Sequence, residues 1–121
     1  SRRLRRLLEE GLLTPTAARV IRSGRMVEIP GGLCLIGRSH SDNLQLESDA
    51  AGLETFSLED RPGPLALALG DAPDLGVMAS AMALYAKVPP DGEASVAGSE
   101  GTRLEHVRPM SREEADRRLV R

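Results

Sequence analysis

The chain has very few aromatic residues: its 121 residues include one Phe, one Tyr and no Trp. A folded core must therefore be built from aliphatic side chains, chiefly Leu, Val, Ile, Ala and Met. The same scarcity argues against a platform of aromatic side chains that stacks the bases of single-stranded RNA.

Cysteine is also scarce. Cys34 is the single cysteine, so no internal disulfide can form and nothing indicates an oxidising compartment. No apolar run approaches the roughly 18–20 residues that a membrane-spanning helix needs. Glu9, Glu10 and Gly11 interrupt the N-terminal leucines, which excludes the apolar core of a signal peptide. The sequence therefore predicts a cytoplasmic protein that does not contact membranes.

Charge is unevenly distributed along the chain. The net charge of −2 divides into +5 for residues 1–38, −9 for residues 42–100 and +2 for residues 101–121. A chain of this kind can present a basic face to an acidic partner such as RNA, or its charges can mix once the chain has folded. Two alternatives also apply to the N-terminal arginines: they can contact a nucleic-acid backbone, or they can form a solvated helix face. These arginines are Arg2, Arg3, Arg5 and Arg6.

Leucines recur at three- and four-residue spacing between Leu4 and Leu12, which predicts an amphipathic helix that stops near Gly11. Thr14 followed by Pro15 is typical of a helix cap and first turn, so we expect a second short helix that ends at Gly24. Residues 1–24 are therefore expected to form a helical arm that packs on, or leads into, the main domain.

From residue 25 the apolar pattern alternates with a period of two, which indicates strands. Expected strands cover 25–29, 33–37, 44–48, 53–60, 65–70, 93–98 and 102–107. An apolar helix over 75–88, capped by Asp71 or Asp74, and a charged helix from Ser111 complete the chain. These elements predict an α+β fold in which a small mixed or antiparallel sheet packs on a central apolar helix. The expected divisions are a helical arm (1–24), an α+β domain (25–110) and a C-terminal helix (111–121).

The segment from Gly37 to Asn43 is the strongest candidate for a binding site, and we expect it to be a polar loop. A glycine lets the backbone approach a ligand closely, and the guanidinium of Arg38 can hold a phosphate through two parallel hydrogen bonds. His40, Ser41 and Asn43 add hydrogen-bond donors for phosphate or 2′-hydroxyl groups. The alternative is a connector whose polar side chains satisfy only their own turn.

The order of motifs between Arg25 and about Gly98 resembles the NFACT-R domain, an RNA-binding module of ribosome quality-control proteins that also occurs as a stand-alone chain. Its pattern of two strands, Gly-Arg and a later Asn is matched here by GGLCLIGRSHSDN. The matching positions further along are Leu46, Phe56, Asp60, Pro62 and Gly63, followed by the helix ASAMALYAK and the strand ASVAG. The tryptophan and histidine of the family pattern fall on Thr55 and Ser57.

The resemblance implies a non-enzymatic RNA-binding module associated with ribosomes or tRNA, without cofactor or metal. The RNA-binding residues that it implies, together with the polar segment, are Gly37, Arg38, Ser39, His40, Ser41, Asn43, Arg25, Asp60 and Gly63. The segment Ile-Gly-Arg-Ser is also similar to the phosphopeptide-binding forkhead-associated domain, but residues 46–54 lack that family's Ser-Arg-x-His segment.

Catalytic chemistry has little support in the sequence. Cys34, His40 and Asp60 are the only set that could supply a nucleophile, a base and an orienting carboxylate. Cys34 lies inside an apolar strand, where a cysteine is usually a small buried hydrophobe. His40 and His106 lack metal-ligand spacing, and no phosphate-binding loop or dinucleotide fingerprint is present. The remaining alternative is a protein-interaction or homodimerisation module that uses the leucine-rich N-terminal helices.

Overall fold

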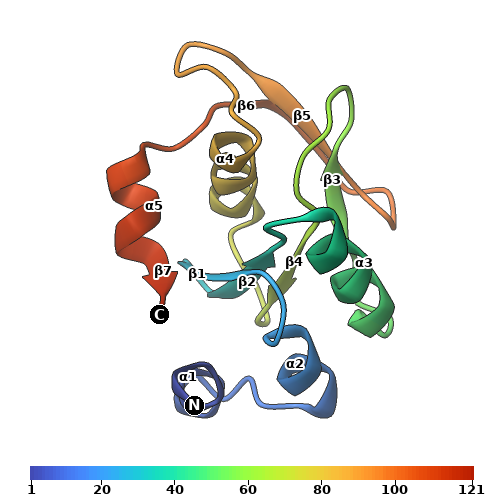
Figure 1. Cartoon of the computed structure of the whole chain (residues 1–121), viewed down its shortest axis with the longest axis vertical. Helices are drawn as coiled ribbons and strands as arrows, with labels where there is room; N and C mark the ends of the chain where they lie inside the picture. Colours follow the sequence, from blue (N-terminus) through green and yellow to red (C-terminus); the bar gives the residue numbers. More distant parts are fainter.

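The computed structural model describes residues 1–121 as a seven-stranded antiparallel sheet with five helices (Figure 1), which confirms the predicted α+β class. The strands lie in the order β6-β5-β3-β4-β2-β1-β7. Their bounds are β1 Arg25–Ile29, β2 Gly32–Ile36, β3 Phe56–Leu58, β4 Ala66–Leu69, β5 Ala94–Gly98, β6 Arg103–Val107 and β7 Leu119–Val120. The helices are α1 Arg2–Glu9, α2 Pro15–Val20, α3 His40–Asp49, α4 Leu75–Tyr85 and α5 Arg112–Arg118.

The central strands are apolar on both sides because both faces of the sheet are covered. Alternate residues of β1 and β2 enter two separate clusters of buried side chains, as the pleat of a strand requires. One cluster contains Val27, Cys34 and Ile36, and the other contains Met26, Leu33 and Leu35. The continuous apolar run Leu33–Ile36 therefore reflects burial on two faces.

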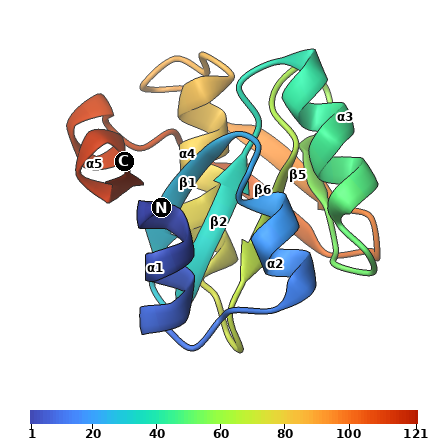
Figure 2. The same ribbon diagram turned by 60° about the horizontal axis from the view of Figure 1, so that its bottom comes forward.

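Helices α4 and α5 cover one face, and α1, α2 and α3 cover the other (Figures 1 and 2). Helix α4 is alanine-rich and buries Met78 and Met82 against the first cluster. The N-terminal helices contribute Leu7 and Val20 to the second cluster, both with no exposed surface. Residues 1–24 thus pack directly on the sheet.

Local signals explain where most helices begin. The Thr14 hydroxyl accepts a hydrogen bond from the Ala17 amide at 3.0 Å, and Pro15 occupies the first turn of α2. Asp74, one of the two predicted caps, holds the start of α4, and Ser111 caps α5. Strand β7 was not predicted, because its two residues extend directly from α5.

Helix α3 corrects two expectations, a polar loop over 37–43 and a strand over 44–48. The Ser39 hydroxyl accepts from the Asp42 amide at 3.1 Å and starts the helix. Leu44 and Leu46 are spaced as in a strand, but Leu46 is fully buried whereas Leu44 is 54% exposed. Leu46 is the one buried residue of the ten-residue helix α3, so the helix contacts the second cluster mainly through this side chain.

The far edge of the sheet is irregular. Strand β6 pairs with β5, as predicted, but the register shifts between Ala94 and Val96. Next to this shift, His106 has a φ of +58°. Glu54 holds the β5–β6 turn, because its carboxylate accepts hydrogen bonds from the Glu100 amide and from both the amide and hydroxyl of Thr102. No helix in the structure has the length and apolar character needed to span a membrane.

Candidate functional site

Two arginines lie together at one end of the β1–β2 hairpin. Arg25 opens β1 and is paired with Ile36, the last residue of β2, so it lies beside the chain that continues into Gly37 and Arg38. The Arg25 Nη1 donates a hydrogen bond to the Gly37 carbonyl at 3.1 Å. Its guanidinium carbon lies 4.0 Å from the centre of the Tyr85 ring at the end of α4. This hairpin register therefore brings together two cations that are distant in sequence.

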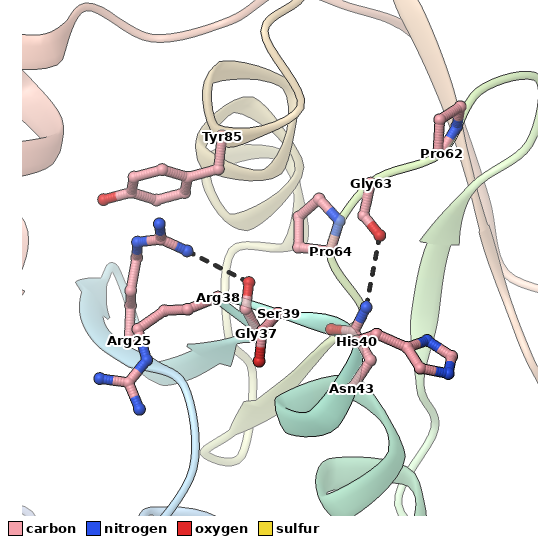
Figure 3. A pocket seen from close by; sticks show the side chains of 10 residues that line it. All are labelled: Arg25, Gly37, Arg38, Ser39, His40, Asn43, Pro62, Gly63, Pro64 and Tyr85. Carbon is pink, nitrogen blue, oxygen red and sulfur yellow. Dashed lines mark hydrogen bonds between the residues drawn. The ribbon is translucent and has the colours of Figure 1, made fainter.

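A pocket of about 350 Å³ opens at this point (Figure 3). Three segments form it: the end of the hairpin with the first turn of α3, the loop before β4, and the end of α4. The lining residues are Arg25, Gly37, Arg38, Ser39, His40, Asn43, Pro62, Gly63, Pro64 and Tyr85. No carboxylate is among them. We call this the α3 pocket.

Arg38 is partly neutralised by one carboxylate. Its Nε donates to the Asp42 carboxylate at 2.9 Å, and the Arg38 backbone amide donates to the same oxygen at 3.0 Å. The hydrogen bond from the Arg38 side chain is the largest influence on the pKa of Asp42 and lowers it. The Arg38 side chain is nevertheless 55% exposed, and its two terminal nitrogens have no protein partner. The ion pair orients Arg38 without closing the pocket.

Asn43 explains the glycine at position 37. A Cβ atom on Gly37 would lie 1.9 Å from the Asn43 Oδ1. That oxygen accepts from the Leu65 amide at 3.0 Å, and Nδ2 lies 3.5 Å from the Gly63 carbonyl. Gly37 therefore makes room for an internal bridge between α3 and the segment before β4, and it also lines the pocket, as the site prediction expects.

Ser39 and His40 form the rim of the pocket at the start of α3. The Ser39 hydroxyl is engaged in capping the helix, whereas the His40 side chain is exposed. Figure 3 shows His40 and Arg38 extending in opposite directions from the pocket. The first turn of α3 also directs backbone amides outward, which favours an anion nearby.

Further arginines surround Arg25 and Arg38. Burial lowers the pKa of Arg3, and the positive charge of Arg38 lowers it further. Burial likewise lowers the pKa of Arg25, with contributions from Arg38 and Arg112. Arg112, from α5, lies 5.6 Å from the Tyr85 ring centre. Arg3, Arg25, Arg38 and Arg112 therefore lie in one region of the surface, which also contains the Asp42 carboxylate, whose charge raises the pKa of Arg3 and Arg25.

Most of the predicted site residues meet at the α3 pocket. Those that line it are Gly37, Arg38, Ser39, His40, Asn43, Arg25 and Gly63. Ser41 and Asp60 do not line it: Ser41 is exposed on α3, and Asp60 is exposed in the loop after β3, 3.6 Å from Arg61. Sequence reasoning missed Tyr85, although a single tyrosine at the end of an otherwise apolar helix was an available signal.

The residues considered for catalysis do not assemble. Cys34 is fully buried in the first cluster, and burial raises the pKa of its thiol. His40 lies on the surface at the start of α3, separate from the buried thiol. His106 is exposed on the edge strand, as the alternation predicts. No group of three or more His, Cys, Asp or Glu side chains is arranged to hold a metal ion.

The leucines of α1 divide between core and surface. Leu7 is fully buried, whereas Leu4 is 43% and Leu8 is 66% exposed. The helix therefore packs on its own sheet, and only part of the leucine stripe faces solvent.

Comparisons with protein-family models, with curated proteins and with solved structures found no match to this chain. The resemblance to the NFACT-R domain therefore remains a prediction from the motifs.

Proposed function

We propose that this protein is a non-enzymatic RNA-binding module and that the α3 pocket is its contact with the phosphate backbone. The observation that carries this proposal is the pocket lining: Arg25 and Arg38 contribute to it and no carboxylate does. The whole chain has a net charge of −2, so this concentration of positive charge is a local property of the fold.

The hydrogen bonds of the arginines support this function. Arg25 and Arg3 donate to backbone carbonyls, of Gly37 for Arg25 and of Ile21 and Gly24 for Arg3. Neutral partners fix the direction of a guanidinium and leave its charge available to a ligand. Arginines held in this way are suited to phosphate oxygens, which receive most protein contacts in nucleic-acid complexes.

RNA is favoured over a free anion for two reasons. Further arginines lie near the pocket, among them Arg3 and Arg112, and this spread of positive charge suits a long polyanion. The resemblance to the NFACT-R domain supports the same ligand class and association with ribosomal RNA or tRNA. Arg25 already lies against the ring of Tyr85, so little of that ring is available for a base to stack on.

The proposal is tested by filter binding of tRNA and ribosomal RNA fragments over a salt series. We expect Arg38→Ala to weaken binding about tenfold, since a charge-assisted hydrogen bond contributes about 1.5–3 kcal/mol. The slope of log K against log salt should decrease by about one. Asp42→Asn should strengthen binding, because it removes the negative charge paired with Arg38 while the carboxamide oxygen can still accept from the Arg38 Nε.

Arg103→Ala is the matched control. Arg103 is exposed on β6 and pairs with Glu59 at 2.6 Å, so its removal changes the net charge equally but leaves the pocket intact. Equal losses for Arg38→Ala and Arg103→Ala would contradict a defined site. Absence of binding at low salt would contradict RNA binding altogether.

A further inference from the structure

Arg38 borders a second pocket as well as the α3 pocket. The second pocket has a volume of about 460 Å³ and lies between α1 and α2. Arg3, Arg22 and Arg38 supply its charge, and no carboxylate lines it. We call it the α1–α2 pocket. Arg38 is the one residue common to the two linings.

We propose that the ligand is a continuous phosphodiester strand that places phosphates on both sides of Arg38, one in the α3 pocket and another in the α1–α2 pocket. This inference rests on the proposed function and specifies the ligand class. A mononucleotide or a single phosphate could occupy only one of the two pockets.

The arginines form a continuous row that connects the two pockets. Arg22 and Arg3 line the α1–α2 pocket, Arg38 lies between the pockets, and Arg25 lines the α3 pocket. Beyond them, Tyr85 separates Arg25 from Arg112 of α5. Neither pocket is lined by a carboxylate, and the one carboxylate beside the row, Asp42, pairs with the Nε of Arg38 and leaves the two terminal nitrogens of Arg38 without a protein partner. Several neighbouring cations match the repeated negative charge of a nucleic-acid strand better than an isolated anion does.

The row is also held in place. Arg3 donates to the carbonyls of Ile21 at 2.5 Å and Gly24 at 2.8 Å, at the end of α2 and before β1. These bonds fasten α1 to the segment that enters β1, and Arg25 is held in the same way by the Gly37 carbonyl. Cations fixed in advance lose less conformational entropy on binding. One held arginine in each pocket, Arg3 and Arg25, therefore favours a ligand that spans both pockets.

The test uses variants that alter one pocket each. Of the two pockets, Arg22→Ala changes the α1–α2 pocket and leaves the α3 pocket intact, and Arg22 is exposed and makes no side-chain hydrogen bond. Arg25→Ala changes only the α3 pocket, Arg38→Ala changes both, and Arg103→Ala is the control. Oligouridylates of two, four and ten nucleotides are compared with inorganic phosphate, and thermal melting verifies that each variant is folded.

We expect Arg22→Ala to weaken decauridylate binding about three- to tenfold and to lower the salt slope by about one. Its effect on inorganic phosphate at the α3 pocket should be negligible, whereas Arg38→Ala should weaken both ligands. Affinity should also rise from two to ten nucleotides.

Two outcomes overturn the inference in different ways. If Arg38→Ala weakens decauridylate but Arg22→Ala does not, the strand does not cross Arg38, although RNA binding stands. If decauridylate fails to bind the unaltered protein at low salt, the inference and the proposed function both fail. If Arg25→Ala reduces folding, the comparison between Arg22→Ala and Arg38→Ala still tests whether the strand crosses Arg38.

Discussion

At the scale of single residues, the shape of the candidate site depends on one side chain that fills the space beside a glycine. Gly37 lacks a Cβ, and the Asn43 carboxamide occupies the space where it would be. Through this contact the end of β2, the first turn of α3 and the segment before β4 are joined. These are the backbone segments that shape the α3 pocket.

A double-mutant cycle tests this arrangement. Gly37→Ala should destabilise the protein because its Cβ would displace Asn43, and Asn43→Ala should destabilise it by leaving the Leu65 amide without its acceptor. We expect about 1–3 kcal/mol for each single variant, measured by urea unfolding. The double variant should lose less free energy of unfolding than the sum of the two single variants, since the alanine Cβ at position 37 has no carboxamide to displace once Asn43 is replaced. Additive losses would contradict the bridge.

Residue patterns could identify Arg38, which lines the α3 pocket, as a candidate site residue, but they could not identify the residues around it. The pairing of Gly37 with Arg38 and the polar residues after it was sufficient to locate the pocket. Tyr85 lines the pocket from α4, and Arg3 of α1 and Arg112 of α5 lie nearby, but no local pattern specifies how these helices are placed on the sheet. Contacts of that kind follow from tertiary packing.

At the scale of elements, the sequence predicted the hairpin, the apolar helix and both N-terminal helices, because each has strong local signals. Thr14–Pro15 and Asp74 mark helix starts, and Pro30–Gly31 separates two apolar strands. Helix α3 was mistaken for a loop and a strand, because Leu44 and Leu46 imitate the alternation of a strand. Only the burial of Leu46 under the rest of the fold settles the helical form.

Helix α1 offers a test at this scale. Leu7 is fully buried and Leu8, its neighbour, is 66% exposed. Leu7→Ala should therefore lower the free energy of unfolding by about 2–5 kcal/mol, as expected for a large buried side chain. Leu8→Ala should change it by no more than about 0.5 kcal/mol. Urea denaturation of both variants provides the comparison. Equal effects would show that α1 does not pack on the sheet.

At the scale of the whole molecule, the sheet separates two cores, and each needs its own layer of helices. The second core includes residues from α1 and α2 together with Met26, Leu33 and Leu35 of the central strands. The expected division at residue 24 follows a change in sequence pattern, whereas the buried cluster crosses that position. Residues 1–24 also carry Arg3, in α1, and Arg22, just after α2, so the same segment that completes the core completes the row of arginines.

Removal of residues 1–24 should therefore have a global effect. The shortened chain would expose the apolar face formed by Met26, Leu33 and Leu35. We expect it to bind a hydrophobic dye such as ANS and to lose its cooperative thermal transition, as in a molten globule. Circular dichroism and dye fluorescence on the full and shortened chains measure this. A sharp transition retained by the shortened chain would contradict a shared core.

The register shift between β5 and β6 disfavours edge-to-edge association between copies of this protein at high concentration. A regular outer strand exposes a row of unpaired amides and carbonyls onto which another chain can add. The left-handed backbone at His106 and the charges of Arg103 and Glu105 break that row. Concentrated solutions should accordingly resist growth into fibrils from this side of the molecule.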